Sequence, residues 1–159
     1  MQPYSFNITK NNYYEFTSIA GNHYACYFVS MKDYLGEYPE ISSDVFMFNI
    51  ELMSNSKKKT DTDERLALTV VNILKRFLSS KEYAAVYVCD NIDNKHEARN
   101  RKFNVWFARF DDGSIIKIDN KVVIEKSVIY NSLLLHKDNP LKNRFIEAFI
   151  ELNNTADNK

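Results

Sequence analysis

The sequence predicts an α+β fold, in which helices pack on a twisted and mostly antiparallel sheet. Through the first third of the chain, aromatic and β-branched residues alternate with polar ones, as in strands with one buried face. The hydrophobic period then becomes helical in two stretches, and a short apolar run between them, Ala84 to Cys89, is typical of a buried strand. Together with a late hairpin and a last helix, these segments predict the order β-β-β-β-α-β-α-β-β-α.

The first four strands are predicted from alternation between turn residues. Their expected ranges are Tyr4 to Ile8, Tyr13 to Ile19, His23 to Met31 and Val45 to Met53. Asn and Gly between them tolerate positive φ, which favours an antiparallel meander. In the fourth strand, side chains two apart share a face, so Phe46, Phe48, Ile50 and Leu52 are expected to be buried and Glu51 to point the other way.

Helical spacing predicts the helices. Apolar residues recur at that spacing from Leu66 to Phe77 and again from about Asn94 to Phe110. A last helix is also expected. Asn139 is its predicted N-cap, and Pro140 is predicted at its first position. Between the second and the last helix we expect a hairpin from Ile115 to Leu135 that turns at Asp119-Asn120-Lys121. Whether the strand also breaks near Lys126 is left open. The expected organisation is one domain, residues 1–153, followed by a frayed tail, residues 154–159.

Composition excludes several classes of protein. With 21 basic and 21 acidic side chains the formal charge is zero, so nucleic-acid binding is not expected from net charge. The apolar runs are too short to cross a membrane, and the start lacks a signal-peptide pattern, which favours a cytoplasmic protein. Cys26 and Cys89 lie in strand-like stretches and are expected to be reduced thiols. The three histidines are scattered, so no metal is expected. The oligomeric state is not predicted.

The candidate site is the stretch CDNIDNKHEARNRKFNVWF, Cys89 to Phe107. It begins at the carboxyl end of the expected buried strand and opens a helix, where backbone N–H groups favour an anion. The candidate ligand-binding residues are Asp90, Asp93, Arg99, Arg101 and Lys102. A structural alternative explains the same charges: Asp90 or Asp93 caps the helix and pairs with Arg99, while Arg101 and Lys102 lie off the apolar face in solvent.

No catalytic residue is predicted. The chain has no glycine-rich phosphate loop, no GxSxG and no dinucleotide fingerprint. His96 beside Glu97 has the chemistry of an acid-base pair, yet no motif places a nucleophile near them. Whether the chain is an enzyme stays open.

Two resemblances extend these expectations. The segments QPYSFNI, YYEFTS, VCDNIDNKHEARNRKFNVWF and YNSLLLHKDNP resemble an uncharacterised family of Bacteroidetes proteins, over most of the chain. That resemblance implies a domain of unknown function, with no activity to carry over.

The order of elements resembles GNAT-type N-acyltransferases, in which an antiparallel strand run is followed by helix, strand, helix and a strand pair. In that fold a glycine-rich loop after the fourth strand holds the pyrophosphate of coenzyme A, where this chain has SNSKKKTDTDE. Family members often carry a tyrosine acid on the later helix, where Phe103 stands here, and Glu51 is the matching candidate base. The resemblance implies a coenzyme A thioester as ligand.

Two functional hypotheses follow. The first is a domain that binds a small anionic or acyl-CoA-like ligand, with acyl transfer left open. The second is a non-catalytic module that binds a partner protein or nucleic acid, as in a bacterial toxin, defence or regulatory system. A concave pocket at the end of Ala84 to Cys89 would favour the first, and an exposed strand edge or flat apolar patch the second.

Overall fold

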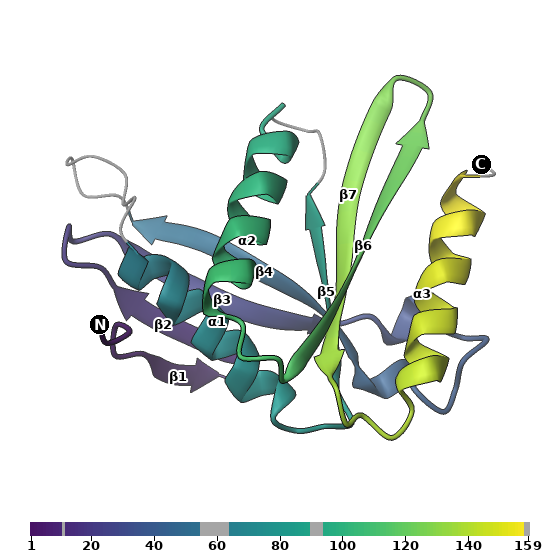
Figure 1. Ribbon diagram of the computed structural model, residues 1–159, viewed down its shortest axis with the longest axis horizontal. Helices are drawn as coiled ribbons and strands as arrows, with labels where there is room; N and C mark the ends of the chain where they lie inside the picture. The colour runs from purple at the N-terminus through teal and green to yellow at the C-terminus, as the bar shows by residue number, and fades with distance from the viewer. Residues whose placement is uncertain (11, 55–63, 90–93, 158–159) are drawn as a thin grey trace.

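The computed structural model describes residues 1–10, 12–54, 64–89 and 94–157. Within those residues the chain forms one seven-stranded sheet and three α-helices (Figure 1). This confirms the predicted α+β class and the order of elements.

The strands are β1 (Asn7–Lys10), β2 (Tyr13–Thr17), β3 (His23–Ser30), β4 (Val45–Ser54), β5 (Ala84–Cys89), β6 (Ile115–Ile124) and β7 (Ser127–His136). The helices are α1 (Glu64–Leu78), α2 (His96–Phe110) and α3 (Lys142–Asp157), with short 3₁₀ turns η1 (Lys32–Tyr34) and η2 (Ser42–Asp44) between β3 and β4. The spatial order of the described strands is β1-β2-β3-β4-β5-β7-β6, and each neighbouring pair is antiparallel except β4 with β5.

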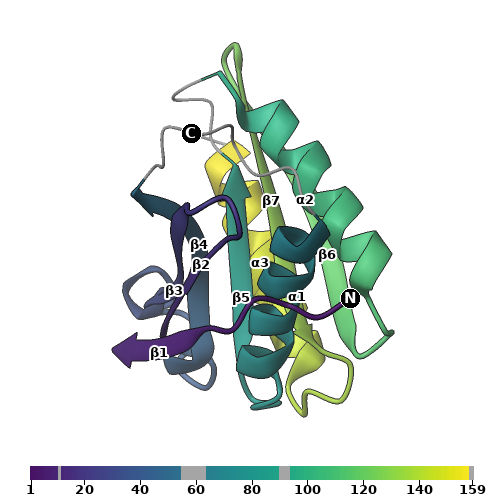
Figure 2. The ribbon, with the colours of Figure 1, turned by 90° about the vertical axis from the view of Figure 1, so that its left-hand side faces the viewer.

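Both faces of the central strand β5 are covered. In the turned view α1 and α2 lie in front of the sheet and α3 behind it (Figure 2). Ala85 contributes to the cluster under α1 and α2, while Ala84 and Val86 contribute to the cluster under α3. A strand that is buried on both sides carries apolar residues at successive positions, which is why Ala84 to Cys89 shows no alternation.

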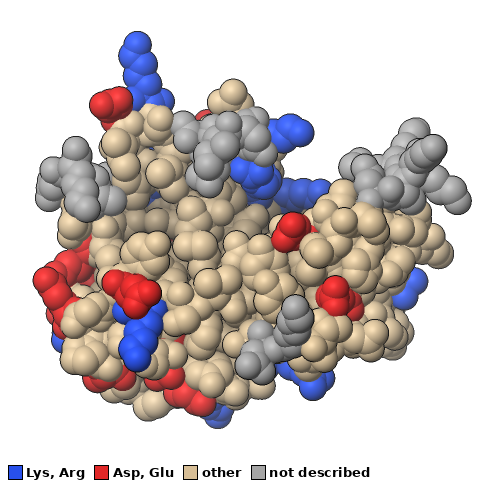
Figure 3. Space-filling model, turned by 180° about the vertical axis from the view of Figure 1, so that it is seen from behind, with Lys and Arg blue, Asp and Glu red and all other residues tan. Residues whose placement is uncertain are grey.

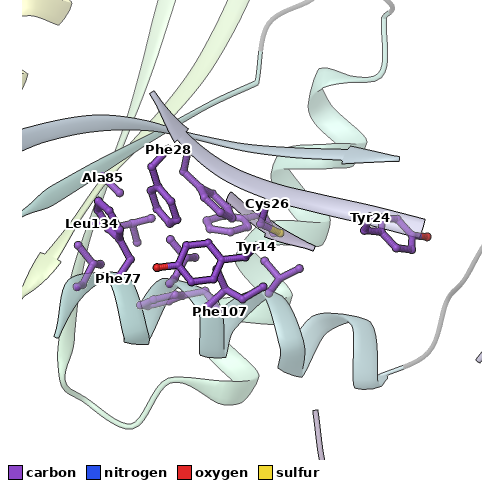
Figure 4. Close-up of a cluster of buried hydrophobic side chains, with 14 of the residues drawn as sticks. Tyr14, Tyr24, Cys26, Phe28, Phe77, Ala85, Phe107 and Leu134 are labelled. Carbon is purple, nitrogen blue, oxygen red and sulfur yellow. The ribbon is translucent and has the colours of Figure 1, made fainter. Parts of the chain in front are cut away.

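Aromatic rings dominate the core between the sheet and α1. Phe77 of α1 stacks on Phe28 of β3 with ring centroids 3.7 Å apart and an interplanar angle of 7°. Tyr14 meets the same Phe28 edge-on, at 5.9 Å. Figure 4 shows Tyr14, Phe28 and Phe77 gathered there with Leu134 of β7. The apolar face of α1 and the apolar faces of the strands therefore pack against each other in one layer.

The parallel contact between β4 and β5 is short. Val45 to Phe48 are in register with Ala84 to Tyr87, and β4 then continues to Ser54 without a further register partner in β5. Figure 1 shows the two strands diverging beyond this contact. The divergence positions the pocket described below.

The predicted turn at Asp119-Asn120-Lys121 was wrong. β6 runs unbroken through these residues, and the hairpin turns at Glu125 and Lys126, where the break had been left open. Asp119 remains in the strand because its carboxylate accepts hydrogen bonds from Lys117 and from Ser132 of β7, the latter at 2.6 Å. A polar run can thus be a strand when its side chains find partners on the sheet face.

Both ends of the chain differ in detail from the expected ranges. β1 begins at Asn7, and Tyr4 is buried instead by α1, since its backbone N–H donates to Thr69 Oγ1 at 2.8 Å. The prediction that Pro140 is the first helical residue was wrong, because α3 begins at Lys142. Asn139 stabilises the turn before the helix, where its Oδ1 accepts from the Leu141 N–H at 2.9 Å. α3 extends through Asp157, past the expected boundary at residue 153. No helix among the described residues has the length and apolar character needed to span a membrane.

Candidate functional site: a pocket between α1 and α2

A pocket opens where β4 and β5 part. It encloses about 250 Å³ and has an aromatic and aliphatic lining with two basic side chains. The lining residues are Tyr24, Ile50, Leu52, Leu66, Tyr87, Arg99, Lys102, Phe103 and Trp106. They come from β3, β4, α1, β5 and α2, so the pocket exists only in the folded chain.

One face of α2 forms a wall of the pocket. Arg99, Lys102, Phe103 and Trp106 follow the spacing i, i+3, i+4, i+7, which places them on one side of a helix. Phe103 anchors this wall, because it is 2% exposed and its ring centroid lies 4.2 Å from that of Tyr87. The Lys102 Nζ lies 5.0 Å from the centroid of the Trp106 ring, within the range of a cation–π contact.

Two basic side chains lie in the described part of the pocket wall. Arg99 and Lys102 are its ionisable cations, and among the described residues no Asp or Glu lines it. The protein as a whole has no net charge. Viewed from behind, basic side chains border a hollow near the upper edge, and acidic ones gather at the lower left (Figure 3). The positive character is therefore local, and it suits an anion that is held beside apolar surface.

Tyr87 is a neutral hydrogen-bonding group in this pocket. Burial raises the pKa of its hydroxyl, the neighbouring Cys89 thiol raises it further, and the positive charge of Arg99 acts in the opposite direction. The hydroxyl therefore stays protonated at neutral pH. It has the properties of a donor to a ligand oxygen, and not those of a base.

The structure brings two of the five predicted site residues together. Arg99 and Lys102 both line the pocket, Arg99 as a half-buried residue and Lys102 as an exposed one, as expected for a side chain off the apolar face. Arg101 is exposed and is not among the lining residues. Asp90 and Asp93 lie outside the described residues, and so does any cap or ion pair that they form.

His96 and Glu97 lie elsewhere on α2. The His96 ring stacks on Tyr130 of β7 with centroids 5.9 Å apart, and Glu97 accepts a hydrogen bond from the same tyrosine hydroxyl at 3.4 Å. Neither residue lines the pocket. Tyr130 thus holds both side chains at the first turn of the helix, away from a ligand in the pocket.

Glu51 lies on the opposite face of β4 from the pocket. Ile50 and Leu52 line the pocket, and Glu51 instead accepts a hydrogen bond from the Tyr27 hydroxyl at 3.2 Å. Leu52 is 39% exposed because it lies beyond the end of the β5 contact, where the expected burial is incomplete. Phe103, at the position that the GNAT resemblance assigns to an acid, offers only an apolar ring.

Sequence reasoning missed Tyr87 and Trp106 as pocket residues. Trp106 could have been found, since it lies seven residues after Arg99 and therefore on the same helix face. Tyr87 gave no such signal, because an aromatic residue within a buried strand is ordinarily a core residue. Only the divergence of β4 from β5 makes it accessible to the pocket.

The described residues form no candidate metal site. No group of three or more His, Cys, Asp or Glu side chains there is arranged to hold a metal ion. Cys26 is buried, and burial raises the pKa of its thiol well above the usual range, so it is an unreactive core group.

Comparison with known proteins gives one match. The model of a family of unknown function (DUF6169) matches residues 62–151, a span that contains α1, β5, α2, β6 and β7 and most of α3. No curated protein and no solved structure matches the chain. The matched span includes the whole α2 wall of the pocket.

Proposed function

The chain belongs to the family of unknown function DUF6169, and from the geometry of its pocket we propose that it binds a small anionic molecule with an apolar or aromatic part. An acyl-CoA-like thioester is the best candidate class. The single observation that carries the proposal is the pocket at the divergence of β4 and β5, with Arg99 and Lys102 on an otherwise apolar and aromatic wall.

The divergence of the strands supports a ligand with an extended part. Beyond Phe48 and Tyr87, β4 and β5 are no longer in register with each other. Backbone groups of strands that part can pair with a ligand, and ligands of α/β sheets commonly bind where neighbouring strands separate. The lining residues Ile50 and Tyr87 come from the two diverging strands.

The chemistry of the lining supports the two-part ligand. Guanidinium and ammonium groups bind phosphate or carboxylate oxygens, while the Trp106 and Phe103 rings offer apolar surface to the uncharged part. A concave, mostly apolar pocket with a few convergent polar groups is the usual form of a small-molecule site.

The topology supports the acyl-CoA class by analogy with GNAT-type N-acyltransferases. The analogy rests on the order of elements alone, an antiparallel strand run followed by helix, strand, helix and a strand pair. The glycine-free loop and Phe103 depart from it. The proposal therefore covers ligand binding, and it assigns no acid or base for transfer.

Calorimetric titration with coenzyme A, acetyl-CoA and uncharged pantetheine tests this proposal. The phosphate-bearing ligands are expected to bind, and pantetheine to bind more weakly. Arg99→Gln and Lys102→Gln should each reduce affinity about tenfold or more, since a hydrogen bond to a charged group contributes about 1.5–3 kcal/mol. Arg101→Gln is the matched control, with the same charge change on an exposed residue of the same helix.

Two outcomes would contradict the proposal. Absence of binding by all three ligands would remove the acyl-CoA class. An equal loss in Arg101→Gln and Arg99→Gln would show a diffuse charge effect and not a site in the pocket. Circular dichroism of each variant distinguishes lost binding from lost folding.

A non-catalytic interaction module remains the second candidate function, and the edge strand β6 favours it. β6 is ten residues long and, in the described part of the sheet, is paired on one side only, with β7. An exposed strand of this length is able to accept a strand from a partner. Val123→Lys, on an exposed residue of β6, should abolish such pairing in a light-scattering or co-purification assay, and an unchanged complex would exclude this edge.

A further inference from the structure

A second cavity lies on the other face of the sheet, under α3. It encloses about 210 Å³ between α3, β5, β6, β7 and η1. Its lining residues are Met31, Tyr34, Val86, Val88, Val122, Ile124, Ile129, Asn131, Phe149, Leu152 and Asn153. Val86 and Val88 lie on the opposite face of β5 from Tyr87, so the strand separates this cavity from the pocket between α1 and α2.

Besides the exposed Tyr34, two asparagines carry the polar groups of this lining, and their hydrogen bonds have a fixed direction. The Asn153 Nδ2 donates to the Phe149 carbonyl oxygen at 2.9 Å, and a carbonyl can only accept. The Asn153 Oδ1 must therefore face Asn131, whose Nδ2 donates to it at 2.7 Å. This leaves the Asn131 Oδ1 as a buried acceptor to which no described residue donates.

An unsatisfied buried acceptor beside an apolar cavity requires an explanation. Most buried polar atoms in proteins have a hydrogen-bond partner, and a lone acceptor destabilises the folded state. A water or a ligand group can supply the missing donor, since Asn131 keeps a second N–H and the Asn153 Oδ1 a second lone pair for further bonds. The mainly apolar lining favours a ligand with a hydrocarbon part. An apolar cavity of about 150 Å³ is large enough to hold a benzene molecule.

We propose that this cavity is a second binding site, independent of the proposed function, for a small, uncharged and mainly apolar molecule that carries one hydroxyl or N–H donor. The hydrocarbon part lies among Val88, Val122 and Ile129, and the donor bonds to the Asn131 Oδ1. A small side-chain adjustment that opens the buried oxygen to the cavity accompanies binding. Charged ligands are excluded, because no ionisable Lys, Arg, Asp or Glu is among the lining residues.

The test uses phenol and anisole, two probes of one ring each that differ in the donor. Backbone amide spectra of the full chain, titrated with each probe, report the affinity and the site. Phenol should shift the signals of Val88, Ile129 and Asn131 and bind about tenfold more tightly than anisole, the ratio that a difference of about 1.4 kcal/mol in binding free energy produces.

Two variants and a control sharpen the test. Val88→Phe fills the cavity and should abolish binding of both probes, whereas Asn131→Leu should remove the preference for phenol. Ile50→Phe narrows the other pocket and should leave phenol binding unchanged. Equal affinities for phenol and anisole in the unaltered chain, shifts confined to the pocket of Arg99, or no binding of either probe would each overturn the proposal. None of these three outcomes depends on a variant that folds.

Discussion

Phe48 of β4 and Tyr87 of β5 are the last register pair of the parallel contact between these strands, with ring centroids 6.0 Å apart. The Phe103 ring of α2 lies against both of them, at 6.5 Å from Phe48 and 4.2 Å from Tyr87. These three aromatic rings pack together at the last register pair of the parallel ladder. Beyond it the strands part, so the same three rings mark the boundary between core and pocket.

Tyr87→Phe is expected to change how stability depends on pH in alkaline solution. Folding raises the pKa of the Tyr87 hydroxyl above its ordinary value of 10.0, mainly through burial. Above about pH 10 the unfolded chain releases this proton and the folded chain retains it, so the free energy of unfolding falls as the pH rises. The variant should lack this part of the fall, which is less than about 1.4 kcal/mol per pH unit. Denaturant titrations at pH 8 to 11 measure it, and parallel curves for variant and wild type would refute the assignment.

Lys117→Met is expected to destabilise the β6–β7 hairpin against α2. The Lys117 side chain is 9% exposed, and its Nζ donates to Asp119 and to the Asn104 Oδ1 of α2. Methionine keeps the apolar stem and removes both bonds. We expect a loss of about 1–2 kcal/mol, at the lower end for charged hydrogen bonds because the Asp119 side chain is 58% exposed.

A double-mutant cycle with Asp119→Asn isolates the pair energy from the Asn104 bond. Burial raises the pKa of Asp119, but the hydrogen bonds from Lys117 and Ser132 together with the Lys117 charge outweigh it and lower the pKa below 3.8. The coupling should therefore be present above that pH and decline as the pH falls through the lowered pKa. A coupling that is equally large in acid would contradict this origin.

Asn139→Ala is expected to lower stability by about 1–2 kcal/mol, because the side chain makes two connections. Its Oδ1 accepts from the Leu141 N–H and so caps the turn that leads into α3, and its Nδ2 donates to the Tyr83 carbonyl oxygen at 3.3 Å. Asn139→Asp keeps the cap acceptor and loses the donor, so it should fall between alanine and wild type. Thermal denaturation of the three proteins measures the series. If aspartate were as destabilising as alanine, the bond to Tyr83 and not the cap would be the main contribution.

Glu125→Gly is expected to stabilise the β6–β7 hairpin. Glu125 lies in the turn with a φ of 55°, a left-handed conformation that costs an L-residue about 1 kcal/mol and glycine almost nothing. The greater freedom of glycine in the unfolded chain offsets part of this gain, which leaves about 0.5 kcal/mol. Lys126→Gly is the control, since positive φ is found at Glu125 and not at Lys126. A destabilised Glu125→Gly in chemical denaturation would show that the glutamate makes contacts that compensate for its conformation.

Much of the fold could be predicted because burial leaves a local pattern. Alternation marked β2, β3 and β4, and helical spacing marked α1 and α2, because each of these elements buries one face. The pattern failed at Asp119 and Lys121, where polar side chains in sequence resemble a turn although a strand partner holds the first of them. Propensity alone cannot supply that partner, which belongs to another strand.

The site could be predicted only in part for a similar reason. The helix face that contains Arg99 follows from spacing, but the pocket depends on where β4 leaves β5, and no local pattern encodes this. Tyr87 and Leu66 are ordinary apolar positions until the strands diverge beside them. The sequence therefore predicted which helix contributes to the site, but not the strand residues that complete the pocket.

The short parallel contact also has a kinetic consequence. The β2–β3 and β6–β7 hairpins pair residues that are close along the chain, whereas Val45 meets Ala84 only after α1 has closed the chain between them. Because closure of a long segment must precede such a contact, the hairpins can form early and the parallel ladder late. The four register pairs of the parallel ladder, and the β5–β7 ladder whose first partners are still farther apart along the chain, are therefore expected to form after the hairpins. The pocket needs both β4 and β5 in place, so it is expected to form late in folding, after α1 has brought these two strands together.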